Sequence, residues 1–317
     1  MVTIGIDLGG TNIKGALIDS KLGILYSFSI ETEADQGKDH VIGRVAEAIQ
    51  MAKAKAGGEI YGVGIGSPGV ISYDRTTVSV PPNFPGWEKE NLAEILREKT
   101  GLDCFVDNDA NLMALGSSRF GMGKQFDSFI MITLGTGVGG GIIYQRKLYR
   151  GVTGGAAELG HVIIDTNGPD SLSPARGGIE AYLGQRFLSR LAWEEIRKRP
   201  DNPLYEQFSG DPARLEPVHL VREADKGNAL AIELLRKAGE KLGIAMVNYV
   251  HVLDIRKIVV SGGVAKAGEY ILGPAREMAM KRLLEPFRTD FEIVYESLGN
   301  DAAVLGAGSL PLEHNNI

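Results

Sequence analysis

Residues 131–143 read MITLGTGVGGGII, and residues 4–16, near the start of the chain, read IGIDLGGTNIKGA. Each stretch is an apolar strand, a turn of glycine and threonine, and a second strand, which predicts a β-hairpin. Glycine lets backbone N–H groups approach phosphate oxygens because no Cβ intervenes. Two such turns facing one another would surround a nucleotide triphosphate, so the repeat indicates phosphoryl transfer by a two-lobed enzyme.

The elements around the first hairpin recur in outline around the second. Apolar patterns predict, before the second hairpin, strands at 2–8, 13–19, 23–31, 61–66 and 103–107, helices around 41–52 and 92–100, and a helix that begins near Asp109. After the hairpin at 128–149 they predict helices at 226–250, 274–285 and 301–309 and strands at 258–260 and 291–295. The stretch 200–217 is expected to run over the surface. Strands that start antiparallel and then alternate with helices, twice over, predict a duplicated α/β architecture with a mixed sheet in each half.

Composition narrows the classes of protein that the chain can belong to. At 317 residues it is too long for one compact core and suggests two domains. A net charge of −6 and an isoelectric point near 5.5 argue against a nucleic-acid partner. The single cysteine, Cys104, excludes an internal disulfide and any multi-cysteine metal site, and its apolar neighbours indicate a buried strand residue. No signal peptide or membrane span is visible, so we expect a cytoplasmic protein without a membrane partner.

Two glycine patterns fit the dinucleotide fingerprint by spacing alone. They are Gly135-x-Gly137-x-x-Gly140 and Gly64-x-Gly66-x-x-Gly69. The fingerprint needs a helix directly after the turn, and both patterns continue instead as apolar strand. The Walker pattern is absent as well, because no Gly-Lys-Ser/Thr follows either loop. A Rossmann cofactor site is therefore disfavoured.

The first turn carries an acid at the end of a strand, Asp7, before Gly9, Gly10, Thr11 and Asn12. The aspartate can be an ordinary exposed hairpin residue, or it can hold Mg²⁺ directly or through water. The partner loop from Thr133 to Gly137 favours the second interpretation, because a kinase needs a phosphate grip on each lobe.

Polar residues Asn108 to Asn111 lie where a strand ends and a helix begins. Asparagine and aspartate are common helix N-caps. Alternatively, Asp109 receives a proton from a substrate hydroxyl while Asn108 orients that substrate. Asp107 is interpreted as a solvated strand end.

Three further motifs allow both a structural and a functional interpretation. Glu158 and His161 are three apart; two ligands make no metal site, and hydrogen bonding to the vicinal hydroxyls of a sugar suits the pair better. Glu180 can open a helix, and Asn83 can be a turn asparagine. The turn at Ser261-Gly262-Gly263 is generic, unless a helix N-terminus there faces the nucleotide.

Taken in chain order, these motifs resemble the ROK family (repressors, open reading frames and kinases), most closely its bacterial glucokinases. The resemblance spans nearly the whole chain. It implies the duplicated ribonuclease H-like fold of actin-like ATPases and hexokinases, with a mixed five-stranded sheet in each lobe, ATP and Mg²⁺ in the cleft, and a homodimer. The expected lobes are residues 1–117 with 301–317, and residues 118–300.

The resemblance also implies a role for each motif. Asp109 matches the catalytic base that removes the proton from the 6-hydroxyl of the sugar. The sugar-binding positions correspond to Asn83, Asn108, Asp109, Glu158, His161 and Glu180. The phosphate and nucleotide positions correspond to Asp7, Gly9, Gly10, Thr11, Asn12, Thr133, Gly135, Thr136, Gly137, Gly262 and Gly263, with Asp7 as the Mg²⁺ residue. Such chemistry depends on positioning and on charge neutralisation.

One departure from the family pattern concerns zinc. In many relatives the histidine of the Glu-x-x-His motif is followed by three cysteines that complete a zinc site. Here those places hold Ser171, Ser173 and Gly178. One imidazole without thiolates cannot make a tetrahedral site, so no structural zinc is expected. Packing of Pro169, Pro174 and Ile179 is the expected substitute.

Two other functions compete with that of a glucose kinase. One is a kinase of the same family that acts on N-acetylmannosamine or N-acetylglucosamine. The other is a sugar-responsive transcription repressor, which would carry a DNA-binding domain ahead of the first strand. Because the first strand is expected at about Val2, that domain has no room, and the repressor is the weaker alternative.

Overall fold

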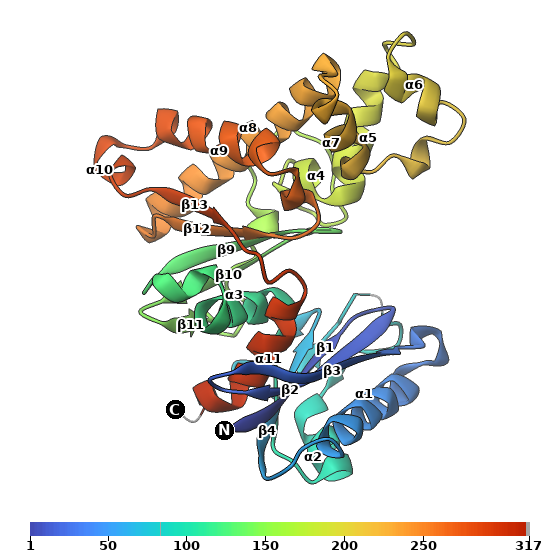
Figure 1. The fold of residues 1–317 in the computed structure, drawn as a ribbon, viewed down its shortest axis with the longest axis vertical. Helices are drawn as coiled ribbons and strands as arrows, with labels where there is room; N and C mark the ends of the chain where they lie inside the picture. Colours follow the sequence, from blue (N-terminus) through green and yellow to red (C-terminus); the bar gives the residue numbers. More distant parts are fainter. Residues whose placement is uncertain (83, 315–317) are drawn as a thin grey trace. The chain divides into compact units, whose positions relative to one another are not determined.

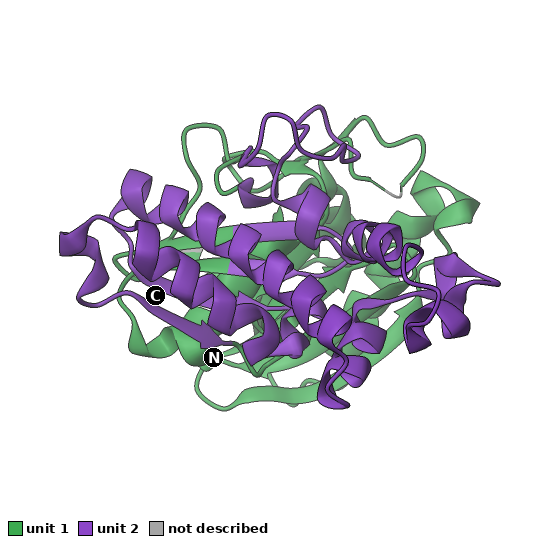
Figure 2. Cartoon of the chain, turned by 90° about the horizontal axis from the view of Figure 1, so that it is seen from above, with its two compact units in different colours: residues 1–131, 141–157, 296–317 green, residues 132–140, 158–295 purple. Residues whose placement is uncertain are grey.

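The computed structural model describes residues 1–82 and 84–314 and forms two compact units, shown separately coloured in Figure 2. Unit 1 comprises Met1–Met131, Gly141–Ala157 and Glu296–Ile317, and unit 2 comprises Ile132–Gly140 and Glu158–Tyr295. The lobe boundaries expected near residues 117 and 300 stay a prediction, because compactness alone does not identify the halves of a duplicated fold.

The first sheet has five strands in the order β3-β2-β1-β4-β8. The strands are β1 (Val2–Leu8), β2 (Asn12–Asp19), β3 (Gly23–Glu31), β4 (Ile60–Ser67) and β8 (Cys104–Asn108). β1 pairs antiparallel with β2 and parallel with β4, and β4 pairs parallel with β8. Helices α1 (Lys38–Lys53) and α2 (Leu92–Thr100) bury their apolar positions in the same core as this sheet. Cys104 is buried as expected, and burial raises the pKa of its thiol to about 12.

The second sheet repeats this topology with the order β11-β10-β9-β12-β13. Its strands are β9 (Phe129–Leu134), β10 (Val138–Tyr144), β11 (Lys147–Tyr149), β12 (Lys257–Ser261) and β13 (Glu292–Tyr295). In both sheets the first three strands lie side by side in chain order. The fourth strand pairs with the other edge of the first strand, and the fifth pairs with the fourth. The β10–β11 pair is antiparallel and the β12–β13 pair is parallel. The predicted duplicated fold with two mixed five-stranded sheets is confirmed.

Two helices of unit 1 cross in close contact, α3 (Asp109–Phe120) and α11 (Asp301–His314) (Figure 1). The crossing depends on glycine, because a Cβ on Gly116 would collide with the carbonyl oxygen of Ala302, and one on Gly306 with that of Leu112. α11 also packs against β1 and β4. The helix that begins with Asp109 is thereby fixed against the sheet. α11 continues to residue 314, five residues beyond the predicted end.

The helices of unit 2 are α4 (Glu180–Leu183), α5 (Gln185–Ile196), α6 (Pro203–Phe208), α7 (Pro217–Asp225), α8 (Ala229–Leu253), α9 (Glu269–Arg282) and α10 (Glu285–Arg288). α8 is largely buried and packs along α9 (Figure 1). Most of residues 200–217 are exposed, as expected of a segment that runs over the surface, but the stretch is not irregular throughout. That stretch contains α6 and anchors itself through three buried side chains, Leu204, Phe208 and Leu215.

A small sheet in unit 1 was not predicted. It consists of β5 (Val70–Ile71), β6 (Val78–Ser79) and β7 (Lys89–Glu90), and each strand has only two residues. Such short strands leave no readable alternation in the sequence. Among the described residues, no helix has the length and apolar character that crossing a membrane requires.

Candidate active site

Two carboxylates of unit 1, those of Asp7 and Asp109, lie at the carboxyl ends of β1 and β8, the strands on either side of β4. Asp7 near the end of β1 pairs with Gly66 of β4, which in turn pairs with Asp107 of β8. Asp109 follows two residues later and begins α3. Asn108 caps that helix, since its side-chain oxygen accepts from the backbone N–H groups of Ala110 at 3.0 Å and Asn111 at 3.4 Å. The N-cap interpretation of Asn108 is therefore correct for its backbone contacts, and its side-chain nitrogen also donates to the Gly69 carbonyl at 3.3 Å.

The first glycine turn is braced from outside the hairpin. The Gly9 N–H donates to the Asn12 carbonyl at 3.1 Å, which closes the turn. The buried Thr32 donates its hydroxyl to the Gly9 carbonyl at 2.7 Å and its N–H to the Thr11 carbonyl at 2.9 Å. The carbonyl groups of the turn are thus occupied by protein, and Gly10 lies at its apex.

Both carboxyl groups have raised pKa values. The pKa of Asp7 is raised to about 6, chiefly by burial and in addition by the charge of Asp109, while Lys14 opposes the shift. The side chain of Asp109 is accessible to solvent, but the surrounding protein displaces much of the water around its carboxyl group. This desolvation raises the pKa of Asp109, and two backbone hydrogen bonds partly oppose the rise. Two neighbouring acids with elevated pKa values are a common feature of functional sites.

The elevated pKa of Asp7 predicts that Asp7→Asn stabilises the ligand-free protein. Above about pH 7 the Asp7 carboxylate is charged in both the folded and the unfolded protein, and its desolvation destabilises only the folded one. Below pH 4 the group is protonated in both the folded and the unfolded protein. We expect a gain of about 1 to 3 kcal/mol in the free energy of unfolding at pH 7.5, shrinking as the pH falls from 6 to 4. Urea denaturation at pH 7.5 and 5 measures it. The exposed Asp35→Asn is the control; an equal gain there, or none in Asp7→Asn, would contradict the assignment.

The second glycine turn, in unit 2, carries a contact that the sequence did not predict. Gly135 donates its N–H to the Gly137 carbonyl at 3.0 Å, and its own carbonyl accepts from the Gln185 N–H at 2.9 Å. The side chain of Glu180 accepts from the Val138 N–H at 3.1 Å. Glu180 also lies directly against Gly137, where an added Cβ would overlap its carboxylate. The candidate sugar-binding glutamate and the candidate phosphate turn are therefore neighbours. Thr133 lies within β9, before the turn begins.

A second glycine pair lies beside the same turn. Gly262 has φ 101°, a conformation that L side chains rarely adopt, and a Cβ there would collide with the Leu134 carbonyl. A Cβ on Gly263 would meet nothing within 4 Å. The expected helix after this turn starts as a 3₁₀ segment of four residues, Val264–Ala267, and the α-helix α9 begins only at Glu269.

Glu158 and His161 form the expected pair on a short 3₁₀ turn. The carboxylate oxygen lies 3.7 Å from the imidazole Nε2, and both side chains are exposed, at 59% and 42%. Ile163 bridges to Gly178, and the Ile179 N–H donates to the Val162 carbonyl at 3.1 Å. This pairing of residues 162–164 with 177–179 connects the segment of His161 to that of Glu180. Asn83 lies outside the described residues.

Serine hydroxyls hold the loop where many relatives have zinc-binding cysteines. The Ser173 hydroxyl lies 3.0 Å from His161 Nδ1 and 3.1 Å from the Ser171 hydroxyl. A Cβ at Gly178 would lie 2.9 Å from the Ala175 carbonyl oxygen, too close for a cysteine without a backbone shift. The residues present do not fit a zinc ion. Among the described residues, no three His, Cys, Asp or Glu side chains are grouped to hold a metal.

The serine network predicts a protein without stoichiometric zinc. One imidazole nitrogen is already hydrogen-bonded and no thiolate is available, so a tetrahedral site cannot form. Metal analysis of the purified, dialysed protein is expected to find well below one zinc per chain. A full equivalent that survives dialysis would contradict this prediction. Of the residues expected to hold this loop by packing, Ile179 is fully buried, whereas the carbonyl groups of Pro169 and Pro174 accept hydrogen bonds from the N–H groups of Gly177 and Arg176.

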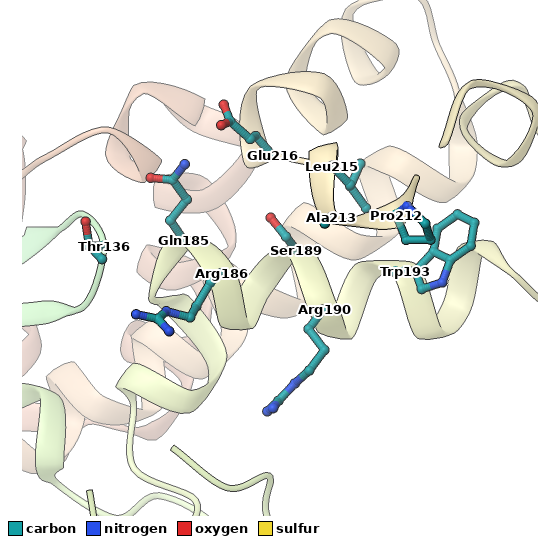
Figure 3. A pocket seen from close by; sticks show the side chains of 10 residues that line it. All are labelled: Thr136, Gln185, Arg186, Ser189, Arg190, Trp193, Pro212, Ala213, Leu215 and Glu216. Carbon is teal, nitrogen blue, oxygen red and sulfur yellow. The ribbon is translucent and has the colours of Figure 1, made fainter. Parts of the chain in front are cut away.

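Figure 3 shows a cavity of about 540 Å³ next to the second turn. It lies between α5 and residues 212–216, and Thr136 marks one end. A neighbouring hollow of about 310 Å³ includes Gly263 and shares Gln185 and Glu216 with the first. The two together form a depression that begins at the glycine turn and is lined by both polar and apolar groups. Gln185 and Glu216 were not predicted; the spacing of Leu188, Ala192 and Ile196, four residues apart, is the signal for α5 in the sequence.

Asp107 differs from expectation. It was interpreted as a solvated strand end, but its side chain is fully buried. The guanidinium groups of Arg75 and Arg150 explain this: their Nε atoms lie 3.3 Å and 2.9 Å from Asp107 Oδ2. Neither arginine is near Asp107 in sequence, so no local pattern could reveal the pairing.

Twin sheets of one topology, each with a glycine turn between its first two strands, are typical of the actin-like ATPase fold that hexokinases share. The chain belongs to the ROK family, whose model matches residues 3–314. It is 35% identical to a glucokinase of Thermotoga maritima over 97% of this chain and 96% of that one. It is 28% identical to the xylose repressor of Bacillus subtilis, covering 98% of this chain and 77% of the repressor.

A solved structure supports the same assignment. The ROK glucokinase of Streptomyces griseus in complex with glucose and AMPPNP matches with a TM-score of 0.81 and 32% identity, covering 98% of this chain and 99% of that one. The predicted membership and the resemblance to bacterial glucokinases are confirmed. The glucokinase relatives are more similar to this chain than the xylose repressor is.

Proposed function

We propose that this protein is an ATP-dependent hexose kinase that phosphorylates the 6-hydroxyl of glucose, with Asp109 as general base. The observation that carries the proposal is the placement of Asp109 at the start of α3, beside Asp7 and in the same unit as the first glycine turn. A base with a raised pKa accepts a proton more readily than an ordinary carboxylate, provided that the pH keeps it ionised.

Unit 2 supplies part of the proposed nucleotide and sugar contacts, and the first glycine turn, Asn108 and Asp109 in unit 1 supply others. The open space around Gly135 and Gly263, where an added Cβ would meet no atom within 4 Å, leaves room for backbone approach by a ligand. The adjoining depression, lined by both polar and apolar groups, offers a place for the nucleoside. Glu180 connects the two substrates, because it bonds the glycine turn and lies on the segment paired with that of His161. Glu158, His161 and Glu180 then orient sugar hydroxyls, together with Asn108 in unit 1 and Asn83.

The residues present fit Mg²⁺. Asp7 offers a hard carboxylate oxygen, and its pKa is raised to about 6 because burial makes the charged carboxylate unfavourable. A bound cation would offset this unfavourable burial of negative charge. When bound, the ion neutralises charge on the phosphates. In the proposed reaction Asp109 takes the proton from the sugar hydroxyl as the hydroxyl attacks the γ-phosphate. The lobes 1–117 with 301–317 and 118–300, a homodimer and a cytoplasmic location belong to the same proposal.

The test is ADP release with ATP across a panel of hexoses and N-acetylhexosamines. We expect the highest kcat/KM with glucose and formation of glucose 6-phosphate, which a coupled dehydrogenase identifies. A preference for N-acetylmannosamine or N-acetylglucosamine would keep the kinase and change the substrate. The proposal fails if no sugar stimulates ADP release while DNA fragments shift the protein at moderate salt, as expected of a repressor.

A further inference from the structure

A buried ion network lies directly behind the proposed base. Asp107 Oδ2 contacts Arg75 and Arg150, and the network continues from Arg75 Nη2 to Glu313 at 3.2 Å. Arg150 donates to the carbonyl groups of Tyr73 and Ser72, the latter at 3.0 Å. These groups come from a loop, from the segment after β11 and from α11, so three distant parts of unit 1 converge on the end of β8.

The other oxygen of Asp107 faces the proposed site. Oδ1 accepts from the Asn108 N–H at 2.8 Å and from the Asn111 side-chain nitrogen at 3.1 Å. Asn108 and Asn111 flank Asp109 and belong to the N-cap and first turn of α3. Both of these hydrogen bonds therefore restrain the corner formed by Asn108 and Asp109, where β8 ends and α3 begins.

Burying this ion network in the protein interior is energetically unfavourable, which argues against a role in packing alone. Burying two carboxylate–guanidinium contacts requires desolvation that apolar side chains would avoid. Arg75 also has φ 63°, a left-handed conformation that is unfavourable for residues other than glycine. Its carbonyl accepts from the Val106 N–H at 2.8 Å, so the strained residue is tied to β8 on two sides.

We infer that Asp107, held by Arg75 and Arg150, is a positioning residue that fixes the orientation of the Asn108–Asp109 corner. The inference rests on the proposed hexose kinase function. A base that must meet a hydroxyl within hydrogen-bond distance loses rate steeply when it is displaced, by about a hundredfold for 1 Å. Asp107 acts through Asp109 and touches no reacting atom.

The test compares Asp107→Asn with Glu90→Gln, which removes the charge of another ion pair in unit 1, that of Glu90 with Lys38 at 2.6 Å. We expect kcat of Asp107→Asn to fall at least about tenfold, with KM for ATP within about twofold of wild type, because neither Asp107 nor the Asn108–Asp109 corner is among the proposed nucleotide contacts. Hydrogen exchange of the Ala110 and Asn111 amides, measured without substrates, is expected to accelerate about tenfold. Glu90→Gln should change neither quantity.

A second variant covers the case in which Asp107→Asn does not fold. Arg150→Ala removes one guanidinium beside a hollow of about 530 Å³ that reaches it from outside. We expect its kcat to fall and to recover when guanidinium ion is added at millimolar concentration. Wild-type kcat and exchange rates in folded variants, with no guanidinium effect, would overturn the inference. Absence of hexose kinase activity in the wild-type protein would instead overturn the proposed function, and the exchange measurement would still test the network.

Discussion

Asp109→Asn is expected to lower kcat by at least about a hundredfold, and by up to about ten-thousandfold, while glucose binding is retained. The amide keeps the size of the carboxylate and can still accept a hydrogen bond from the sugar hydroxyl, but it cannot take the proton. The Asn108 cap and the Asp107 contacts do not involve the changed group, so the corner should keep its geometry.

Glucose affinity by calorimetry and kcat by ADP release separate binding from chemistry. Asn108→Ala makes a useful comparison, since it removes a proposed sugar contact and the helix cap and should weaken glucose binding as well. Turnover of Asp109→Asn within tenfold of wild type would remove Asp109 from its role. The raised pKa of Asp109 adds an expectation for the wild type: log kcat/KM should fall as the pH drops through that pKa, because only the ionised form is a base.

Gly262→Ala is the second change with a large expected effect. Its φ of 101° is strained for alanine, and the new Cβ would collide with the Leu134 carbonyl, which is backbone and cannot rotate away. We expect the free energy of unfolding to fall by at least about 2 kcal/mol. The displaced turn at Gly135 should also raise KM for ATP, because Leu134 leads directly into it.

The adjacent Gly263→Ala is the matched control. Gly263 has ordinary helical angles of φ −62° and ψ −39°, and its Cβ would meet nothing within 4 Å. Alanine there should leave stability unchanged or raise it by about 0.4 to 1 kcal/mol. If the open space holds the nucleotide, KM for ATP rises without loss of stability. Equal thermal stability of the two variants would refute the steric argument.

The local chemistry of the site could be predicted from the sequence because each motif is encoded within a few residues. A glycine turn needs only neighbouring glycines, and Asn108 with Asp109 marks a strand-to-helix junction by residue type alone. The duplication was equally visible, since two similar hairpins each precede the same succession of helices and strands. The structure confirms the two mixed five-stranded sheets.

Contacts between residues far apart in the chain could not be predicted. Asp107 was misread because its arginine partners come from a loop and from the segment after β11. Ser173 was noticed only as a missing cysteine, whereas the structure shows its hydroxyl beside His161. By contrast, α5 is encoded locally, because the apolar residues Leu188, Ala192 and Ile196 recur at helical spacing.

The central claim is that both glycine turns bind one polyphosphate while Asp109 faces the sugar hydroxyl. A crystal structure of the protein with glucose and a non-hydrolysable ATP analogue tests it most directly. The account predicts backbone N–H groups of residues 9–11 and 135–137 on the phosphate oxygens, and the glucose 6-hydroxyl about 2.6 to 3.2 Å from the Asp109 carboxylate. Phosphates bound away from either turn, or a 6-hydroxyl that faces another residue, would contradict it.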